Sequence, residues 1–380
     1  MLNAHIIGWG KYLPSKIVTN AELAQTSNID AAWVAARTGI EARYIADPKQ
    51  ASADMATRAA RDALQVADVP PSSLDLIIAA TNTPDYWFPA TACLVQDALG
   101  AERAGAFDLA AGCSGFLYAL IVAERFLRSG AYRNILVVGV ETVSRIVDWR
   151  DPICAYFGDG AGALVLTASE QAGGLLGFAL SSDGSGGNLL ILPGGGSRHG
   201  ITQQVLDQGL QYGRTDGRAV YRYGLRAMTW MGQRALRDAR LKIQDIDLFI
   251  PHQTNQLLIQ QVAERLGVPH EKVFVNVARY ANISSAAIPV TLCDALAAGR
   301  IHPGNRLLLT AFGGGLTCAG VVWQWSQPRP QPPLSVIRRF WHALWDAQAA
   351  FRSRFFRLER QLDTLIPTEE DGEKKRRRDV

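Results

Sequence analysis

Residues 74–82 read Leu-Asp-Leu-Ile-Ile-Ala-Ala-Thr-Asn, and residues 246–255 read Ile-Asp-Leu-Phe-Ile-Pro-His-Gln-Thr-Asn. Each stretch is a short apolar run that ends in polar residues, which is typical of a buried strand followed by a loop. An Arg- and Ala-rich stretch of helical character precedes each of them, at residues 58–66 and 233–240. The chain therefore contains the same helix–strand–loop pattern twice.

Two further pairs of segments extend this repeat. Residues 134–141 resemble residues 305–312, and each half closes with a strand of small residues, at 162–166 and 319–325. Chance likeness could also explain the pairs, because buried strands draw on few residue types, but four similar features in the same order favour duplication. This alternation of helix and strand predicts a duplicated α/β fold.

The repeat also predicts how the chain is divided. We expect an N-terminal half at 1–172, a C-terminal half at 173–326, and a tail at 327–380. The Gly- and Ser-rich residues 181–200 predict a loop after the first half. That loop either faces a ligand or only connects the halves.

The tail begins with a proline-rich stretch at 328–333, which predicts a stiff, extended linker. Beyond it, apolar or neutral residues recur at spacings of four and three, which is a heptad stripe on one helix face; the positions are 337, 341, 344, 348, 351, 355, 358, 362 and 365. Arginines flank the stripe, and a basic run occupies 374–378. Three interpretations stay open: a helix packed on the body, a coil that binds itself or a partner protein, and a helix on an anionic membrane.

Composition and charge exclude several classes of protein. Apolar residues make up 48% and charged residues 19%, which suits a globular core. The net charge of +4 comes from the tail, with its 12 Lys/Arg and 8 Asp/Glu, so the halves show no basic excess that would point to nucleic acid. The five cysteines are scattered, which predicts no disulfide framework, no zinc site and a reducing cytoplasm. We expect no signal peptide and no membrane span.

Cys113 is the strongest candidate for a chemical role. It follows the short strand that begins at Ala106 and precedes a helical pattern that runs to Arg128. A helix N-terminus supplies partial positive charge, so we expect this position to favour the nucleophilic thiolate. A cysteine among small residues is more often structural, and the other four cysteines are expected to be small buried residues.

Candidate partners of Cys113 also lie at strand ends. His252 follows the strand at 246–250, Asn282 lies between a strand and a small-residue helix, and the glycine run 313–315 follows another strand. Taken singly, each has an ordinary structural explanation: a structural histidine, a helix N-cap and a turn. In a duplicated fold, however, equivalent strand ends of both halves can meet at one site.

These motifs together resemble the β-ketoacyl-acyl carrier protein synthase III family of the thiolase-like superfamily, over residues 3–326. The motifs are Trp33 with Arg-Thr-Gly-Ile-Glu-Ala-Arg at 37–43, Cys-Ser-Gly-Phe at 113–116, Phe-Gly-Asp-Gly-Ala-Gly at 157–162, Pro-His-Gln-Thr-Asn at 251–255, Asn-Ile-Ser-Ser-Ala at 282–286 and Phe-Gly-Gly-Gly at 312–315. The resemblance implies a duplicated five-layer αβαβα fold, a homodimer, and acyl-CoA and acyl carrier protein as partners. It implies no metal and no cofactor.

The resemblance also assigns roles to individual residues. Cys113 would take an acyl group from a thioester, and His252 with Asn282 would stabilise the enolate formed when a malonyl unit loses CO₂. The backbone N–H groups of Cys113 and Gly314 would form the oxyanion hole. Substrate contacts are implied for Trp33, Arg37, Phe88, Arg222, Asn255 and Phe312; Phe88 would reach into the partner subunit's acyl pocket, and Arg222 would dock CoA or carrier protein.

The sequence departs from the family pattern in several places. Leu257 stands where many relatives have Arg, Ala281 where Gly is common, and Cys318 where Trp is common; residues 149–151 are also rearranged. These changes leave the substrate and the pathway open. One alternative is a specialised acyltransferase or a non-decarboxylative condensing enzyme of secondary metabolism, for example in polyketide formation. Two further interpretations stay open: a thiolase that uses Cys318 as a second cysteine, and a non-catalytic scaffold that acts through its tail.

Overall fold

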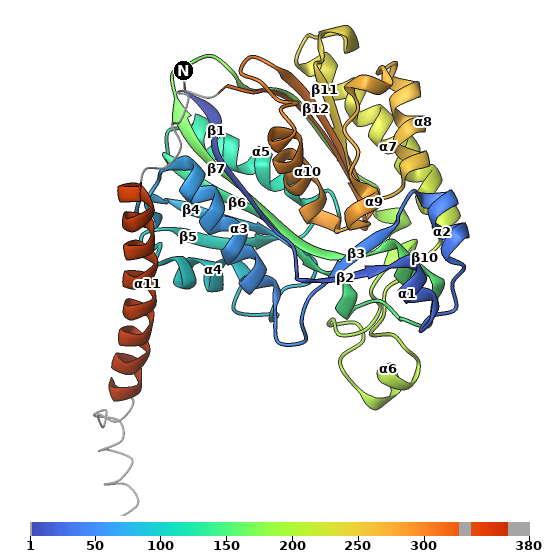
Figure 1. Ribbon diagram of the computed structural model, residues 1–380, viewed down its shortest axis with the longest axis horizontal. Coiled ribbons are helices and arrows are strands. Elements are labelled where there is room, and N and C mark those ends of the chain that lie inside the picture. The colour runs from blue at the N-terminus through green and yellow to red at the C-terminus, as the bar shows by residue number, and fades with distance from the viewer. Residues whose placement is uncertain (1, 327–335, 364–380) are drawn as a thin grey trace, which may run out of the picture.

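The computed structural model describes residues 2–326 and 336–363, and the chain forms five layers (Figure 1). Two sheets enclose a central pair of helices, and a further pair of helices covers the outer face of each sheet. The predicted duplicated α/β fold is confirmed. The proline-rich stretch 328–333, position 365 of the heptad pattern and the basic run 374–378 lie outside the described residues.

The first sheet has the strand order β1-β7-β6-β4-β5. The strands β6, β4 and β5 run parallel, with β5 at the edge, and β7 is antiparallel to both of its neighbours, β6 and β1. The strands are β1 Asn3–Tyr12, β4 Leu76–Ala80, β5 Gly105–Leu109, β6 Asn134–Thr142 and β7 Asp159–Ser169.

The second sheet repeats this arrangement in the order β8-β13-β12-β11. The pair β11–β12 is parallel and the other pairs are antiparallel, and a parallel bridge from Phe249 to Val273 stands where β5 stands in the first sheet. The strands are β8 Gly174–Ser182, β11 Leu248–Pro251, β12 Arg306–Gly313 and β13 Thr317–Gln324.

The major helices also occur in matching pairs. The helices α5 and α10 fill the central layer, α3 and α4 cover the first sheet, and α7 and α8 cover the second (Figure 1). Their bounds are α3 Ser52–Ala67, α4 Thr91–Leu99, α5 Gly115–Arg128, α7 Gly217–Asp238, α8 Gln256–Leu266 and α10 Ala287–Ala297.

Shorter elements gather at the end of the sheets where β3 and β10 lie (Figure 1). Two of them, β9 and β10, form a two-stranded ribbon that is hydrogen-bonded to neither main sheet. The set is α1 Asn20–Ala24, α2 Ala31–Thr38, β2 Lys16–Thr19, β3 Ala42–Ile45, β9 Leu190–Ile191, α6 Gln203–Asp207, β10 Arg214–Thr215 and α9 Val277–Tyr280.

Burial explains why the central elements read as continuous apolar runs. Every residue of β4 is buried, as expected for a parallel strand that helices cover on both faces. The helix α10 is buried along its first nine residues, and an all-round apolar sequence is what such a position requires. Close approach at its N-terminal end depends on Gly139 of β6, where an added Cβ would lie 2.4 Å from the carbonyl oxygen of Ser285.

The tail forms one long helix, α11 (Val336–Asp363), that stands at the side of the body next to α4 (Figure 1). Arg352 of α11 forms an ion pair with Glu102, just beyond α4. The heptad helix predicted for the tail is therefore present. Among the described residues, no helix combines the length and the apolar character needed to cross a bilayer.

We predict that Gly139→Ala lowers the free energy of unfolding by about 1–3 kcal/mol, because the new methyl group collides with backbone atoms that cannot rotate away. Urea denaturation followed by circular dichroism would measure this. Gly105→Ala in β5 of the same sheet is the control, because its Cβ would meet the nearest atom at 3.5 Å. Equal denaturation midpoints for the two variants would contradict the expectation.

Candidate active site

Cys113 lies at the predicted strand-to-helix turn. The strand β5 ends at Leu109 and α5 begins at Gly115, so Cys113 stands just before the first turn of the helix. Gly112 adopts a φ of 55°, a left-handed conformation that glycine accepts easily and that turns the chain sharply. The thiol lines a cavity of about 260 Å³.

The acidity of this thiol differs from the expectation. Burial raises the pKa of Cys113 to about 11, and the nearby Glu141 carboxylate acts in the same direction. Hydrogen bonds from Ser284 and Asn282 act to lower the pKa but do not outweigh burial. Burial thus acts against the expected effect of the helix N-terminus, because loss of hydration disfavours the charged thiolate.

The glycine run of the second half meets the cysteine turn of the first half through backbone atoms alone. A Cβ on Gly112 would lie 2.4 Å from the amide nitrogen of Gly314, and one on Gly313 would lie 2.3 Å from that of Cys113. Within residues 2–326 and 336–363, neither amide N–H donates a hydrogen bond to another residue. Two unpaired N–H groups beside a nucleophile are what an oxyanion hole requires.

Hydroxyl groups tie the same two loops together. Ser114 donates from Oγ to Thr317 Oγ1 at 2.8 Å, and Thr317 donates to the carbonyl oxygen of Ala111 at 2.7 Å. Ser114 directly follows the cysteine, whereas Thr317 begins β13. The turn that carries Cys113 is thus held by the other half of the chain.

His252 follows β11 directly, as the sequence predicted, and is almost completely buried. Its backbone N–H donates to the carbonyl oxygen of Thr310, and its ring packs edge-on against Phe312, with centroids 5.8 Å apart. Burial lowers the pKa of His252 to about 3, so the imidazole is neutral near pH 7. Its Nδ1 is buried and has no hydrogen-bond partner among the described residues, and His252 is not among the residues that line the cavity beside Cys113.

Asn282 follows the short helix α9, and not a strand as the sequence predicted, and is held in one orientation by its neighbours. Its Oδ1 accepts from the backbone N–H of Ser284 at 2.8 Å, and its Nδ2 donates to Thr254 Oγ1 at 3.3 Å. Thr254 is two residues from His252, so this bond places the amide beside the histidine loop. Ala281 has φ 56° and ψ −158°, a backbone region that is nearly restricted to glycine. The strain lies directly before the candidate catalytic amide.

Glu141 is a buried carboxylate that the sequence motifs did not predict. Both of its oxygens accept two hydrogen bonds: from the side chain of Asn82 and from Ser284 at Oε1, and from the backbone of Asn82 and from Thr83 at Oε2. It therefore links β6 of the first half to the Asn282 loop of the second. The signal was an acidic residue inside an otherwise apolar strand, since buried carboxylates are rare without partners.

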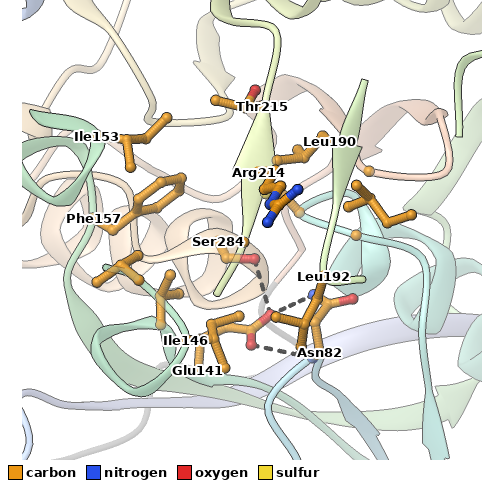
Figure 2. A pocket seen from close by; sticks show the side chains of 17 residues that line it. Asn82, Glu141, Ile146, Ile153, Phe157, Leu190, Leu192, Arg214, Thr215 and Ser284 are labelled. Atoms are coloured by element: carbon orange, nitrogen blue, oxygen red, sulfur yellow. Dashed lines mark hydrogen bonds between the residues drawn. The ribbon is translucent and has the colours of Figure 1, made fainter. Parts of the chain in front are cut away.

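The cavity beside Cys113 has a largely apolar wall, and Figure 2 shows Ile153 and Phe157 facing Leu190 and Leu192 across it. Glu141 lies at one end with its bonds to Asn82 and Ser284. The apolar residues of the wall are Val143, Ile146, Val147, Ile153, Phe157, Leu190, Ile191 and Leu192. The glycine-rich region 181–200 thus contributes directly to the cavity, which favours its ligand-facing interpretation.

The implied substrate-binding residues occupy several places. Trp33 is exposed on α2, and Arg37 lies on the same helix, where its carbonyl oxygen accepts from Asn255 Nδ2 at 3.0 Å. Asn255 also caps α8 through its Oδ1, so both polar atoms of its side chain are engaged within the protein. Phe312 contacts the His252 ring and not the cavity wall.

Phe88 and Arg222 lie on the surface, away from the cavity wall. Phe88 is 87% exposed and lies in the segment between β4 and α4, so this aromatic ring has no cover in the single chain. Arg222 on α7 lines a separate surface cavity together with Arg226 and Arg265.

The remaining cysteines do not join the site. Cys318 is buried in the core between the second sheet and α7, with its thiol directed to the carbonyl oxygen of Ser181. This position disfavours the thiolase interpretation, which needs a second cysteine at the cavity. Cys93 is exposed, which corrects the expectation that it is buried.

Comparison with known proteins gives one consistent result. Models of the family described as 3-oxoacyl-[acyl-carrier-protein] synthase III match residues 107–184, and its C-terminal part matches residues 236–325. The β-ketoacyl-[acyl-carrier-protein] synthase III of Desulfitobacterium hafniense strain Y51 is 43% identical over 328 residues, which cover 86% of this chain and 99% of the relative.

Solved structures agree with these relatives. The 3-oxoacyl-[acyl-carrier-protein] synthase III of Aquifex aeolicus VF5 is 41% identical with a TM-score of 0.78, and covers 85% of this chain and 100% of its own. The priming β-ketosynthase of the R1128 polyketide biosynthetic pathway is 32% identical with a TM-score of 0.79, covering 86% of this chain and 97% of its own.

We predict that alkylation of Cys113 by iodoacetamide accelerates about tenfold per pH unit between pH 7 and 10, because the thiolate fraction grows by that factor below the raised pKa. The measurement uses peptide mass mapping in a Cys93→Ser background, which removes the exposed thiol. A rate that levels off below pH 8 would show that the helix N-terminus wins over burial.

Proposed function

Because the chain belongs to the β-ketoacyl-acyl carrier protein synthase III family, whose members are condensing enzymes of fatty acid synthesis, we propose that Cys113 carries an acyl group that is condensed with a malonyl thioester. The observation that carries this proposal is the position of Cys113. Its thiol faces a mostly apolar cavity, next to two unpaired backbone N–H groups and the Asn282 amide.

In the first step, Cys113 Sγ attacks the carbonyl carbon of an acyl thioester. A thiol with a pKa of about 11 must lose its proton as it attacks, and the departing thiolate of the substrate receives a proton in exchange. The oxygen of the tetrahedral intermediate becomes negative, and the N–H groups of Cys113 and Gly314 are free to stabilise it. The products are the acyl-enzyme and a free thiol.

In the second step, a malonyl thioester loses CO₂ and becomes an enolate. The neutral imidazole of His252 and the Nδ2 amide of Asn282 would donate hydrogen bonds to the enolate oxygen. The enolate carbon then attacks the acyl carbonyl, the bond to Cys113 breaks, and the sulfur takes up a proton. Decarboxylation drives the reaction, so the proposal needs neither a metal nor an organic cofactor.

The surroundings of the cavity support the proposed substrates. An apolar wall suits the hydrocarbon part of an acyl group. Trp33 and Arg37 would contact CoA, and the surface of Arg222, Arg226 and Arg265 would dock the acyl carrier protein through its charge. The exposed Leu257 stands where many relatives have an arginine, so one positive charge is missing from this chain's surface.

We further propose that the enzyme is a homodimer. The strand β5 is the open edge of the first sheet, and Phe88 is exposed in the neighbouring segment with Tyr86 and Trp87. An unpaired strand edge beside a cluster of exposed aromatic side chains favours pairing with a second copy.

We also propose that the enzyme works in the cytoplasm, because its five cysteines are all free thiols, as is usual in a reducing compartment.

Intact-mass analysis with a panel of acyl-CoAs tests the chemistry. We predict an acyl adduct on the unmodified chain and none on Cys113→Ala. His252→Ala and Asn282→Ala should still form the adduct but discharge it to malonyl-CoA or malonyl-carrier protein about 100-fold more slowly, because they lose donors to the enolate. His270→Ala, which changes an exposed histidine in the turn after α8, is the matched control.

Two outcomes would count against this proposal. No adduct with any acyl donor would remove the enzyme function and favour a scaffold role. An adduct that malonyl thioesters do not discharge would favour a specialised acyltransferase or a non-decarboxylative condensing enzyme.

We also predict that discharge of the pre-formed acyl-enzyme varies little between about pH 5 and 8, because burial keeps His252 neutral down to a pKa of about 3. Rapid-quench mass spectrometry of the loaded protein would measure this step alone. A decline with a midpoint near pH 6.5 would mean that His252 titrates as an exposed histidine does.

A further inference from the structure

The tail helix α11 docks on the body through a small, polar face. Ala349 is buried against Gly100, where an added Cβ would lie 2.6 Å from the Ala349 Cβ. Asp97 of α4 accepts hydrogen bonds from Ser353 at 2.8 Å and from Arg357 at 2.7 Å. Arg352 and Phe356 line the same contact region, whereas Phe351 and Phe355 of the heptad stripe do not.

The stripe positions whose side chains the structure describes, from 341 to 358, face away from the body. An α-helix turns about 100° per residue, so positions spaced by four and three fall on one side, whereas Ala349 and Ser353 fall on another. Phe351 is 71% exposed and Phe355 is 53% exposed, which excludes burial against α4. The other exposed apolar side chains of α11 on or next to this stripe are Phe340, Trp341, Leu344 and Leu358.

The charge of the helix distinguishes between two possible partners of this exposed face, a second copy of α11 and an anionic membrane. Residues 336–363 contain six arginines and three acidic residues. Arg352 and Arg357 pair with Glu102 and Asp97 of the body, so a small positive excess is left on the helix, which opposes pairing of two such helices and favours an anionic surface. Arg354 is exposed between Phe351 and Leu358 at the edge of the stripe. An aromatic-rich apolar face bordered by arginine is typical of a helix that lies in the headgroup region of an anionic bilayer.

We propose that α11 binds an anionic lipid surface, with the stripe of Phe351 and Phe355 inserted among the acyl chains and Arg354 at the headgroup phosphates. The contacts of Ala349, Ser353 and Arg357 keep the helix attached to α4 during binding. The enzyme body would then be held at the membrane surface without a spanning segment. This inference is independent of the proposed chemistry.

Co-sedimentation of the full chain with phospholipid vesicles tests this binding. We expect binding to vesicles of phosphatidylglycerol and phosphatidylcholine, weak binding to phosphatidylcholine alone, and release at high salt. The double variant Phe351→Ser/Phe355→Ser should bind about tenfold more weakly or worse, since its apolar insertion is lost. Arg354→Glu should reduce binding to anionic vesicles only.

The matched control is Ile201→Ser/Leu206→Ser, which removes two exposed apolar side chains near α6, remote from α11 (Figure 1). It should bind as the unmodified chain does. Thermal unfolding of each variant would verify folding, and the acyl-adduct assay would report on the chemistry separately. Absence of binding to anionic vesicles would overturn the proposal. Binding of the phenylalanine variant at the level of the unmodified chain would also overturn it. A lower oligomeric mass of this variant in light scattering would show instead that the stripe binds a second copy of the chain.

Discussion

The active site depends on one contact between the two halves, the backbone approach of Gly112–Cys113 to Gly313–Gly314. No side chain fits between these loops, because a Cβ on Gly112 or on Gly313 would lie within 2.5 Å of a backbone nitrogen. The approach brings two amide N–H groups to the nucleophile at fixed positions. Since both loops emerge from sheets with buried cores on both faces, their positions are set by packing of the whole body.

Burial governs the electrostatics of the site. Cys113 and His252 are both shifted toward their neutral forms, although one is an acid and the other a base. A helix N-terminus stabilises an anion by about 1 kcal/mol, whereas loss of hydration can shift a pKa by several units. The resting site therefore holds no charge on its nucleophile or its imidazole, and charge develops only where hydrogen-bond donors are already in place.

The sequence alone predicted much of this arrangement, for a physical reason. Cys113, His252 and Asn282 border strands or short helices whose apolar runs are visible in the sequence, and parallel strands end at a common edge. Glu141 could not be predicted as part of the site in this way, because its link to the site is a hydrogen bond from Ser284, which lies in the other half of the chain. The sequence also did not predict which face of α11 contacts the body, because the strongest apolar pattern lies on the face that is exposed.

The ribbon of β9 and β10 contributes Leu190, Ile191, Arg214 and Thr215 to the cavity, yet it is hydrogen-bonded to neither main sheet. One part of the cavity wall is thus separate from the two sheets that position Cys113, His252 and the glycine run 313–315. A substitution in the ribbon therefore breaks no hydrogen bond of the strand ladders in either main sheet. Such an arrangement allows the shape of the cavity to change through the ribbon while the two sheets keep their form.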